Sequence, residues 1–180
     1  MRVTFAPSRA ALVAAAAALA LLVLPPLAAS AAARGLTAED KQLLKQYHLS
    51  LDTTQRCVNA YREAIAEPGP KQELEGAKSK QSEKTLGQII KSWDAEYPAT
   101  AAALKKRSCQ PRDFVLSTSV MAYARLVDQA RQQGKATQGF DFVTPENLAT
   151  FDKNKDRFAA LTAELQQLVA PQAASRRPQR

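Results

Sequence analysis

The chain has 180 residues and a formal net charge of +8 at pH 7. Much of this excess comes from Arg2 and Arg9 near the start and from Arg176, Arg177 and Arg180 at the end. The part of the chain between these two groups has a net charge of about +3. That charge is too small for the basic stripe of a nucleic-acid-binding surface, so nucleic acid is excluded as the expected partner. One histidine and 6 glycines exclude most histidine-based metal sites and a glycine-rich phosphate loop.

Residues 1–33 have the pattern of a bacterial signal peptide. A basic start precedes an apolar segment, Ala10 to Leu24, that is long enough for a signal and short for a membrane span. Pro25 and Pro26 end the segment. Two stretches of small residues then offer cleavage sites, Ala29-Ser30-Ala31 and Ala31-Ala32-Ala33. The alternative is an uncleaved signal anchor, whereas the lack of a nearby cysteine gives no indication of a lipoprotein.

Signal removal would leave about 147 residues, enough for one domain with one core. We expect a periplasmic or secreted protein with no membrane span after cleavage. Its single domain would cover residues 34–170, and residues 171–180 would form a disordered basic tail. Cys57 and Cys109 are the only cysteines, and an even count in an exported chain predicts a structural disulfide. A reactive or resolving pair is the alternative.

One long helix is predicted from Thr37 to Glu67. Thr37 is a suitable N-cap with Asp40 three residues later, and apolar residues recur at steps of three and four, as in Leu44, Tyr47, Leu51, Thr54, Val58, Tyr61 and Ile65. The sequence from Glu67 to Pro70 ends this helix. Lys71 to Lys84 is almost entirely polar and is either a solvated helical piece or a linker.

A second short helix follows, marked by the apolar residues Leu86, Ile89, Ile90, Trp93 and Tyr97. Pro98 ends it, and Ala99 to Arg107 predicts one or two further helical turns. Lys105, Lys106 and Arg107 fall in the last turn, where cations offset the negative end of the helix dipole. They also provide, with Arg112, a possible anion-binding site at the junction of two helices.

Pro111 suits the first position of the next helix, which has two apolar stripes and is therefore predicted to be the central one. Gly134 suits its C-terminal cap. The link from Lys135 to Val143 carries Phe140 and Phe142 and is predicted to lay a short extended piece over the core. Thr144 and Pro145 then start a final helix, marked by Leu148, Phe151, Phe158, Leu161, Leu165 and Leu168.

Two segments carry a resemblance. Pro111 to Leu116, with the following Met121-Ala122, resembles a helix start found in small exported bacterial helical proteins. Pro145 to Leu148, with Phe151 to Lys155, is similar to a later segment of the same proteins. The resemblance covers about the last 75 residues and implies a helical fold and export, but no activity.

A second resemblance concerns Leu36 to Asp40 and Leu51 to Gln55. Each is similar, with one difference, to the Leu-Thr-x-x-Gln motif of the small helical periplasmic chaperones of the Spy and CpxP type. This resemblance implies an alternative function, in which the protein shields unfolded clients on a concave helical face.

Catalytic and cofactor chemistry finds little support. His48 is interpreted as a boundary residue paired with Asp52, and Met121 as a core residue, although the two together could ligate a haem. The acid pairs are most simply solvating charges, namely Asp94 with Glu96 and Asp152 with Asp156. We therefore expect no enzyme activity, no cofactor and no metal site.

Together these observations predict an all-α, disulfide-stapled bundle of four or five helices, monomeric or dimeric. The expected function is that of a binding or accessory protein of the bacterial envelope. Its partner would be an envelope or periplasmic protein, bound by the exposed side of the first helix or by the polar segment Lys71 to Lys84.

Overall fold

The computed structural model describes residues 35–77, 84–134, 136–137 and 139–169. All regular elements in these ranges are helices, which confirms the all-α class. They are α3 (Ala38–Gln46), α4 (Leu51–Ala64), α5 (Pro68–Ala77), α6 (Leu86–Glu96), α7 (Pro98–Lys106), α8 (Pro111–Gln132), α9 (Pro145–Lys153) and α10 (Lys155–Val169). The predicted signal peptide and basic tail lie outside the described residues.

These eight helices exceed the four or five that were predicted, because two predicted helices are each divided and α5 is an additional one. The predicted helix from Thr37 to Glu67 breaks between α3 and α4, where Tyr47 adopts an extended backbone with ψ 128°. Buried Asn147 of α9 holds the break: its Nδ2 donates to the Tyr47 carbonyl at 2.8 Å, and its Oδ1 accepts from the Leu49 N–H at 2.7 Å. Ser50 then caps α4.

The predicted final helix is likewise divided, at Asn154. In a continuous helix the Thr150 carbonyl would accept the Asn154 backbone N–H. Here it accepts the Asn154 side-chain amide at 2.9 Å, and the backbone N–H turns to Phe151. The break lets two rings from different helices stack, since Phe151 and Phe158 lie 5.6 Å apart with an angle of 6° between their planes.

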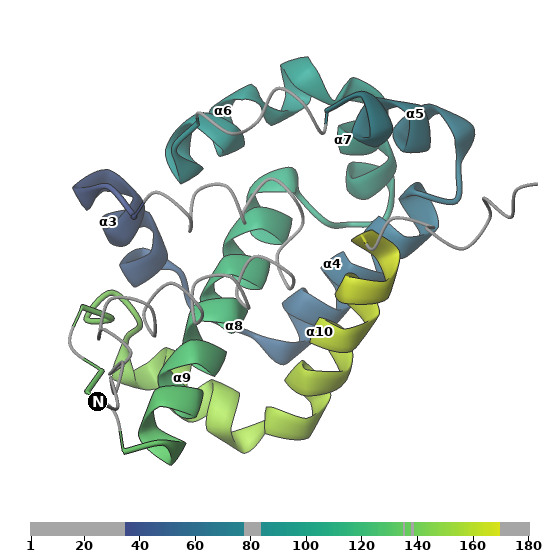
Figure 1. Ribbon diagram of the computed structural model, residues 1–180. Helices are drawn as coiled ribbons and strands as arrows, with labels where there is room; N and C mark the ends of the chain where they lie inside the picture. The colour runs from purple at the N-terminus through teal and green to yellow at the C-terminus, as the bar shows by residue number, and fades with distance from the viewer. Residues whose placement is uncertain (1–34, 78–83, 135, 138, 170–180) are drawn as a thin grey trace, which may run out of the picture.

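Helix α8 is the central element, as predicted. It contacts α3, α4, α6, α7 and α9, and three consecutive polar residues, Ser117, Thr118 and Ser119, are buried within it. Figure 1 shows α8 running through the middle of the molecule, with α4 beside it and α10 along α4. Helices α5, α6 and α7 lie together at one end of the molecule, the top in Figure 1.

Two acidic side chains cap helices of this end layer, one from α3 outside the layer and one from α5 within it. Buried Asp40 of α3 accepts the Gly87 N–H in the first turn of α6 at 3.0 Å, as well as the Thr37 N–H that completes its own capping box. Glu73 of α5 accepts the N–H groups of Ala99 and Thr100 at 2.8 and 2.9 Å. Helix α7 has no cap from its own N-cap side chain, so Glu73 supplies one.

The predicted extended piece before α9 is instead a pair of turns. Phe140 donates its N–H to Thr137, and Val143 donates to Phe140. The turns still place aromatic rings on α8 as expected, because Phe142 is buried edge-on against Tyr123 with ring centroids 5.0 Å apart. Gly134 ends α8 with a positive φ of 62° and its N–H bonded to Arg131.

Candidate functional site

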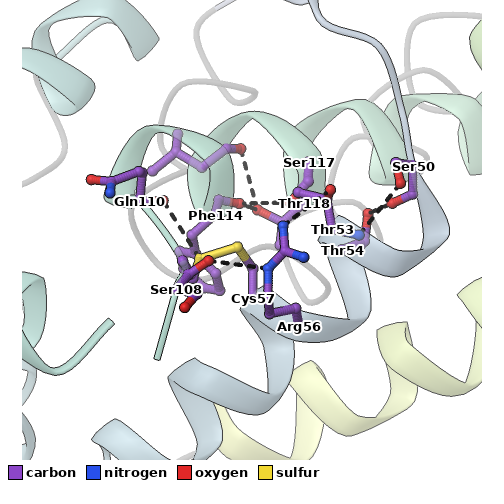
Figure 2. Close-up of a disulfide and its surroundings, with 12 residues drawn as sticks. Ser50, Thr53, Thr54, Arg56, Cys57, Ser108, Gln110, Phe114, Ser117 and Thr118 are labelled. Atoms are coloured by element: carbon purple, nitrogen blue, oxygen red, sulfur yellow. Dashed lines mark hydrogen bonds between the residues drawn. A yellow bond between two sulfur atoms is a disulfide. The ribbon is translucent and has the colours of Figure 1, made fainter. Parts of the chain in front are cut away.

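The predicted disulfide between Cys57 and Cys109 is present. Figure 2 shows it joining α4 to the turn that precedes α8. Both cysteines are buried, and no free cysteine lies among the described residues. Closing the 52-residue separation stabilises the fold by about 4 kcal/mol through the entropy that the unfolded chain loses. The bond therefore fixes the α7–α8 turn against α4.

The α7–α8 turn is a Schellman motif, which ends α7 by satisfying its last carbonyls. The N–H of Cys109 bonds to the Leu104 carbonyl at 3.1 Å, and that of Ser108 bonds to the Lys105 carbonyl at 3.0 Å. The motif requires a left-handed residue, usually glycine, but Ser108 occupies it with φ 57°. Among the described residues Ser108 is the only non-glycine with positive φ, and this conformation costs about 1–2 kcal/mol.

A shallow, open hollow lies on the outer face of α4, beside this turn. Six of its lining residues lie along one face of α4, and the seventh belongs to the α7–α8 turn. They are Asp52, Gln55, Arg56, Asn59, Ala60, Glu63 and Arg107. We call this set the α4 hollow. It combines two carboxylates, two guanidinium groups and two amides around a small alanine.

Polar contacts join the α7–α8 turn, which forms one side of the α4 hollow, to helix α4, which forms its floor. Arg56 donates from Nε to the Ser108 carbonyl at 3.0 Å (Figure 2). Arg107 forms ion pairs with Glu63 and Glu67, each at 2.7 Å. Hydrogen bonds to Glu67 and Glu63 raise the pKa of Arg107 above its ordinary value. Arg107 thus stays cationic while bridging α7 to the end of α4.

The opposite side of α4 is tied to α10. Arg157 donates to Gln55 Oε1 at 3.3 Å, and Arg62 donates to both Asn59 Oδ1 at 3.1 Å and Glu164 at 2.9 Å. The carbonyl oxygens of the two floor amides are therefore engaged by arginines. Their NH₂ groups bond to no atom of the described residues, which makes them donors for an added acceptor.

The predicted anion-site residues are not brought together around the start of α8. Lys105 pairs with Asp94 of α6 at 2.7 Å, whereas Arg107 turns to α4. Lys106 and Arg112 are exposed. Two of the four cations therefore already face carboxylates on different helices, and both the anion-binding and the capping interpretations of this cluster stay predictions.

The other chemical candidates lie apart. His48 is exposed and its Nδ1 lies 3.4 Å from Glu146 rather than beside Asp52, so the predicted pairing with Asp52 was wrong. Met121 is buried, and its sulfur accepts from Thr162 at 3.8 Å. Members of the two acid pairs form ion pairs with basic residues instead. Asp94 pairs with Lys105, and Glu96 with Lys84. Asp152 pairs with Arg131.

The described residues contain no cluster of three or more histidine, cysteine, aspartate or glutamate residues arranged to hold a metal ion. In the same ranges no helix has the length and apolar character needed to cross a membrane.

No protein-family model, curated protein or solved structure matches this chain.

The α4 hollow was partly accessible from sequence. The polar residues Asp52, Gln55, Arg56, Asn59 and Glu63 recur at one helical face opposite the apolar seam, which is the signal of an exposed side. Two components carried no local signal. The sequence does not say that Arg107 approaches Glu63, or that α10 lies on the other side of α4, because both contacts join residues more than 40 positions apart.

Proposed function

We propose that the protein is an exported, non-catalytic binding or accessory module of the bacterial envelope, which docks a protein partner in the α4 hollow. The observation that carries this proposal is the hollow itself. It is open and shallow, and its lining consists mostly of polar side chains. Hydrogen bonds to the α7–α8 turn on one side and to α10 on the other hold these side chains in position. Such a surface suits a polar protein segment better than an enclosed small molecule.

The lining indicates the chemistry of the partner segment. Asp52 stands toward the start of α4 and Arg56 one turn after it, whereas Glu63 near the other end is already paired with Arg107. A segment with one basic end and an acidic centre is therefore complementary. Eleven helical residues span about 16 Å, which corresponds to about five residues of extended chain. The amides of Gln55 and Asn59 can donate to backbone carbonyls of such a segment.

Site-specific photo-crosslinking in living cells tests this proposal. A photoreactive phenylalanine at Gln55 should capture one defined envelope protein, and the product should disappear when Asp52→Asn and Arg56→Gln are added. The matched control is the same photoreactive residue at Gln42, which is exposed on α3. The same products from both positions, or a product insensitive to the charge changes, would contradict docking in the α4 hollow.

The chaperone alternative predicts a different result. A client-shielding protein suppresses the aggregation of an unrelated unfolded protein at near-stoichiometric ratio. The large apolar side chains of the described helices are gathered in one core, and the α4 hollow is polar, so we expect no such suppression. Full suppression would favour the chaperone function.

A further inference from the structure

We propose that the Cys57–Cys109 bond controls the α4 hollow, so that the binding surface is completed only when the two thiols are oxidised. This inference rests on the proposed function, since it concerns the regulation of the same site. Figure 2 shows the bond between the floor helix α4 and the turn that forms one side of the hollow. Cys57 lies next to Arg56, and Cys109 lies two residues after Arg107.

The other polar contacts between the turn and α4 itself are exposed, namely the Arg56–Ser108 bond and the Arg107–Glu63 bond. The part-buried Arg107–Glu67 ion pair reaches the segment after α4 and does not hold the turn over the floor. Exposed polar contacts of this kind contribute little to stability. The backbone of the turn also carries the left-handed Ser108, which favours relaxation once the turn is released. The covalent bond is therefore the contact that holds Arg107 and Ser108 over the floor.

Loss of the bond lowers the free energy of unfolding of the whole protein, but the packing of the helices in the folded state does not depend on it. Helices α7 and α8 both pack on α4 through buried apolar side chains, including Leu104 and Phe114. Phe114 stacks on Tyr61 of α4 with ring centroids 4.7 Å apart, and Trp93 of α6 meets Phe114 edge-on. Loss of the bond should therefore open the turn locally while these helices remain packed.

The burial of both sulfurs indicates a single maturation step and not a reversible switch. Each cysteine is at most 1% exposed in the folded protein, so a reductant has little access to the bond. In the forming step the two thiols lose two protons and two electrons as the sulfur–sulfur bond forms. A protein disulfide of an oxidising compartment accepts both electrons and takes up two protons to become a dithiol.

Limited trypsin digestion tests, without any partner, whether the disulfide holds the turn in place. The turn offers cleavage after Lys105, Lys106 and Arg107, and the α9–α10 junction offers a matched control at Lys153 and Lys155. In the variant with Cys57→Ala and Cys109→Ala we expect cleavage at the turn to be faster by about tenfold, since proteolysis follows the population of the open form. Cleavage at Lys153 and Lys155 should stay within about twofold.

Two outcomes would overturn the proposal. Unchanged cleavage at both junctions means that the turn keeps its place without the bond. Equal acceleration at both junctions means that the bond holds the whole fold and not the hollow. Because crosslinking from Gln55 reports on the partner and trypsin reports on the turn, failure of this inference and failure of the proposed function give different results.

A second measurement applies if the double variant does not fold, as judged by circular dichroism. Oxidised protein is then reduced with dithiothreitol in urea, which gives the reductant access to the buried bond, and is returned to native buffer that still contains dithiothreitol. Hydrogen exchange is then followed by mass spectrometry. Faster exchange confined to the peptide that contains Ser108 and Cys109 supports the proposal. Exchange that rises equally in peptides of α10 contradicts it.

Discussion

At the scale of single residues, buried and half-buried polar side chains hold distant parts of the fold together. Asp40 caps α6, Glu73 caps α7, and Asn147 fixes the break between α3 and α4. Each accepts backbone N–H groups that would otherwise lack partners, and an unsatisfied buried donor costs about 1–3 kcal/mol. These three residues therefore act as long-range attachments rather than solvated polar groups.

Replacing Asp40 should destabilise the protein strongly. Asp40→Ala leaves the N–H groups of Thr37 and Gly87 without their acceptor, so we expect a loss of about 1–3 kcal/mol in urea unfolding. Asp40→Asn keeps one acceptor oxygen and should lose less. The neighbouring exposed Glu39, changed to alanine, is the control and should have little effect. Equal losses for Asp40→Ala and Glu39→Ala would refute the capping role.

Ser108 should respond to substitution according to backbone conformation. Ser108→Gly removes the cost of the left-handed residue but adds freedom to the unfolded chain, so stability should rise by less than about 1 kcal/mol. Ser108→Val places a branched side chain in the same conformation and should lower stability by about 1–2 kcal/mol. Denaturant unfolding measures both changes. A valine variant as stable as the glycine variant would show that the turn relaxes freely.

At the scale of helices, local sequence signals predicted where a helix begins better than they predicted whether a helix continues without a break. Helix α3 begins after Thr37 with a capping box to Asp40, and α8 begins at Pro111, both as the sequence predicts. The long helices predicted across Tyr47 and Asn154 were wrong because the apolar period continues through both breaks. At Asn154 the competing bond is local, but at Tyr47 the partner is Asn147, 100 residues away.

Contacts between residues far apart in the sequence also limited the prediction of the candidate site and of α5. The disulfide was predicted from the cysteine count and the expected export, whereas the face that it completes depends on where α7 and α10 pack. The segment from Lys71 was predicted to be a solvated helix or linker, and the structure makes it helical up to Ala77. Glu73 docks this helix, which local sequence could not indicate because its partners lie 26 and 27 residues away.

Glu73 should therefore control the attachment of α5 to α7. In Glu73→Ala the first turn of α7 loses its acceptor, so we expect a loss of about 1–2 kcal/mol, typical of a missing helix cap. Hydrogen exchange should quicken at the amides of Ala99 and Thr100. The exposed neighbour Gln72, changed to alanine, serves as the control. Unchanged exchange at Ala99 in Glu73→Ala would rule out the cap.

At the scale of the whole molecule, all 4 tyrosines are shielded from solvent to a degree that affects their titration. Burial raises the pKa of Tyr47, Tyr61 and Tyr97 to about 12. Burial also raises the pKa of Tyr123, with a smaller contribution from Asp40. The ordinary tyrosine pKa is 10.0, so the folded protein holds its phenolic protons more tightly than the unfolded chain does.

This difference predicts alkaline destabilisation. Below pH 10 both states are protonated, and the full stability is present. As the pH rises from 10 toward 12, the unfolded chain releases protons that the folded state retains, so unfolding becomes more favourable. The melting temperature should fall over this range, with tyrosinate absorbance appearing together with unfolding. Tyr61→Phe should make the fall shallower. A melting temperature constant to pH 12 would contradict the burial of these phenols.

The basic tail should contribute little to folding. Truncation after Val169 removes Arg176, Arg177 and Arg180, and an exposed terminus adds little to the stability of a domain. We expect the melting temperature to change by no more than about 2 °C in a calorimetric scan. A larger fall in the truncated protein would mean that the tail docks on the helices.

The position of the disulfide also determines how the chain transmits mechanical tension. A pull applied to the two ends passes from Cys57 directly to Cys109, because the covalent bond bypasses the 52-residue segment between them. Helices α5, α6 and α7 lie inside this closed ring. The extended length of the stretched chain is therefore shorter by about 190 Å than the residue number implies. Helices α3, α8, α9 and α10, and the part of α4 before Cys57, lie outside the ring and bear the load.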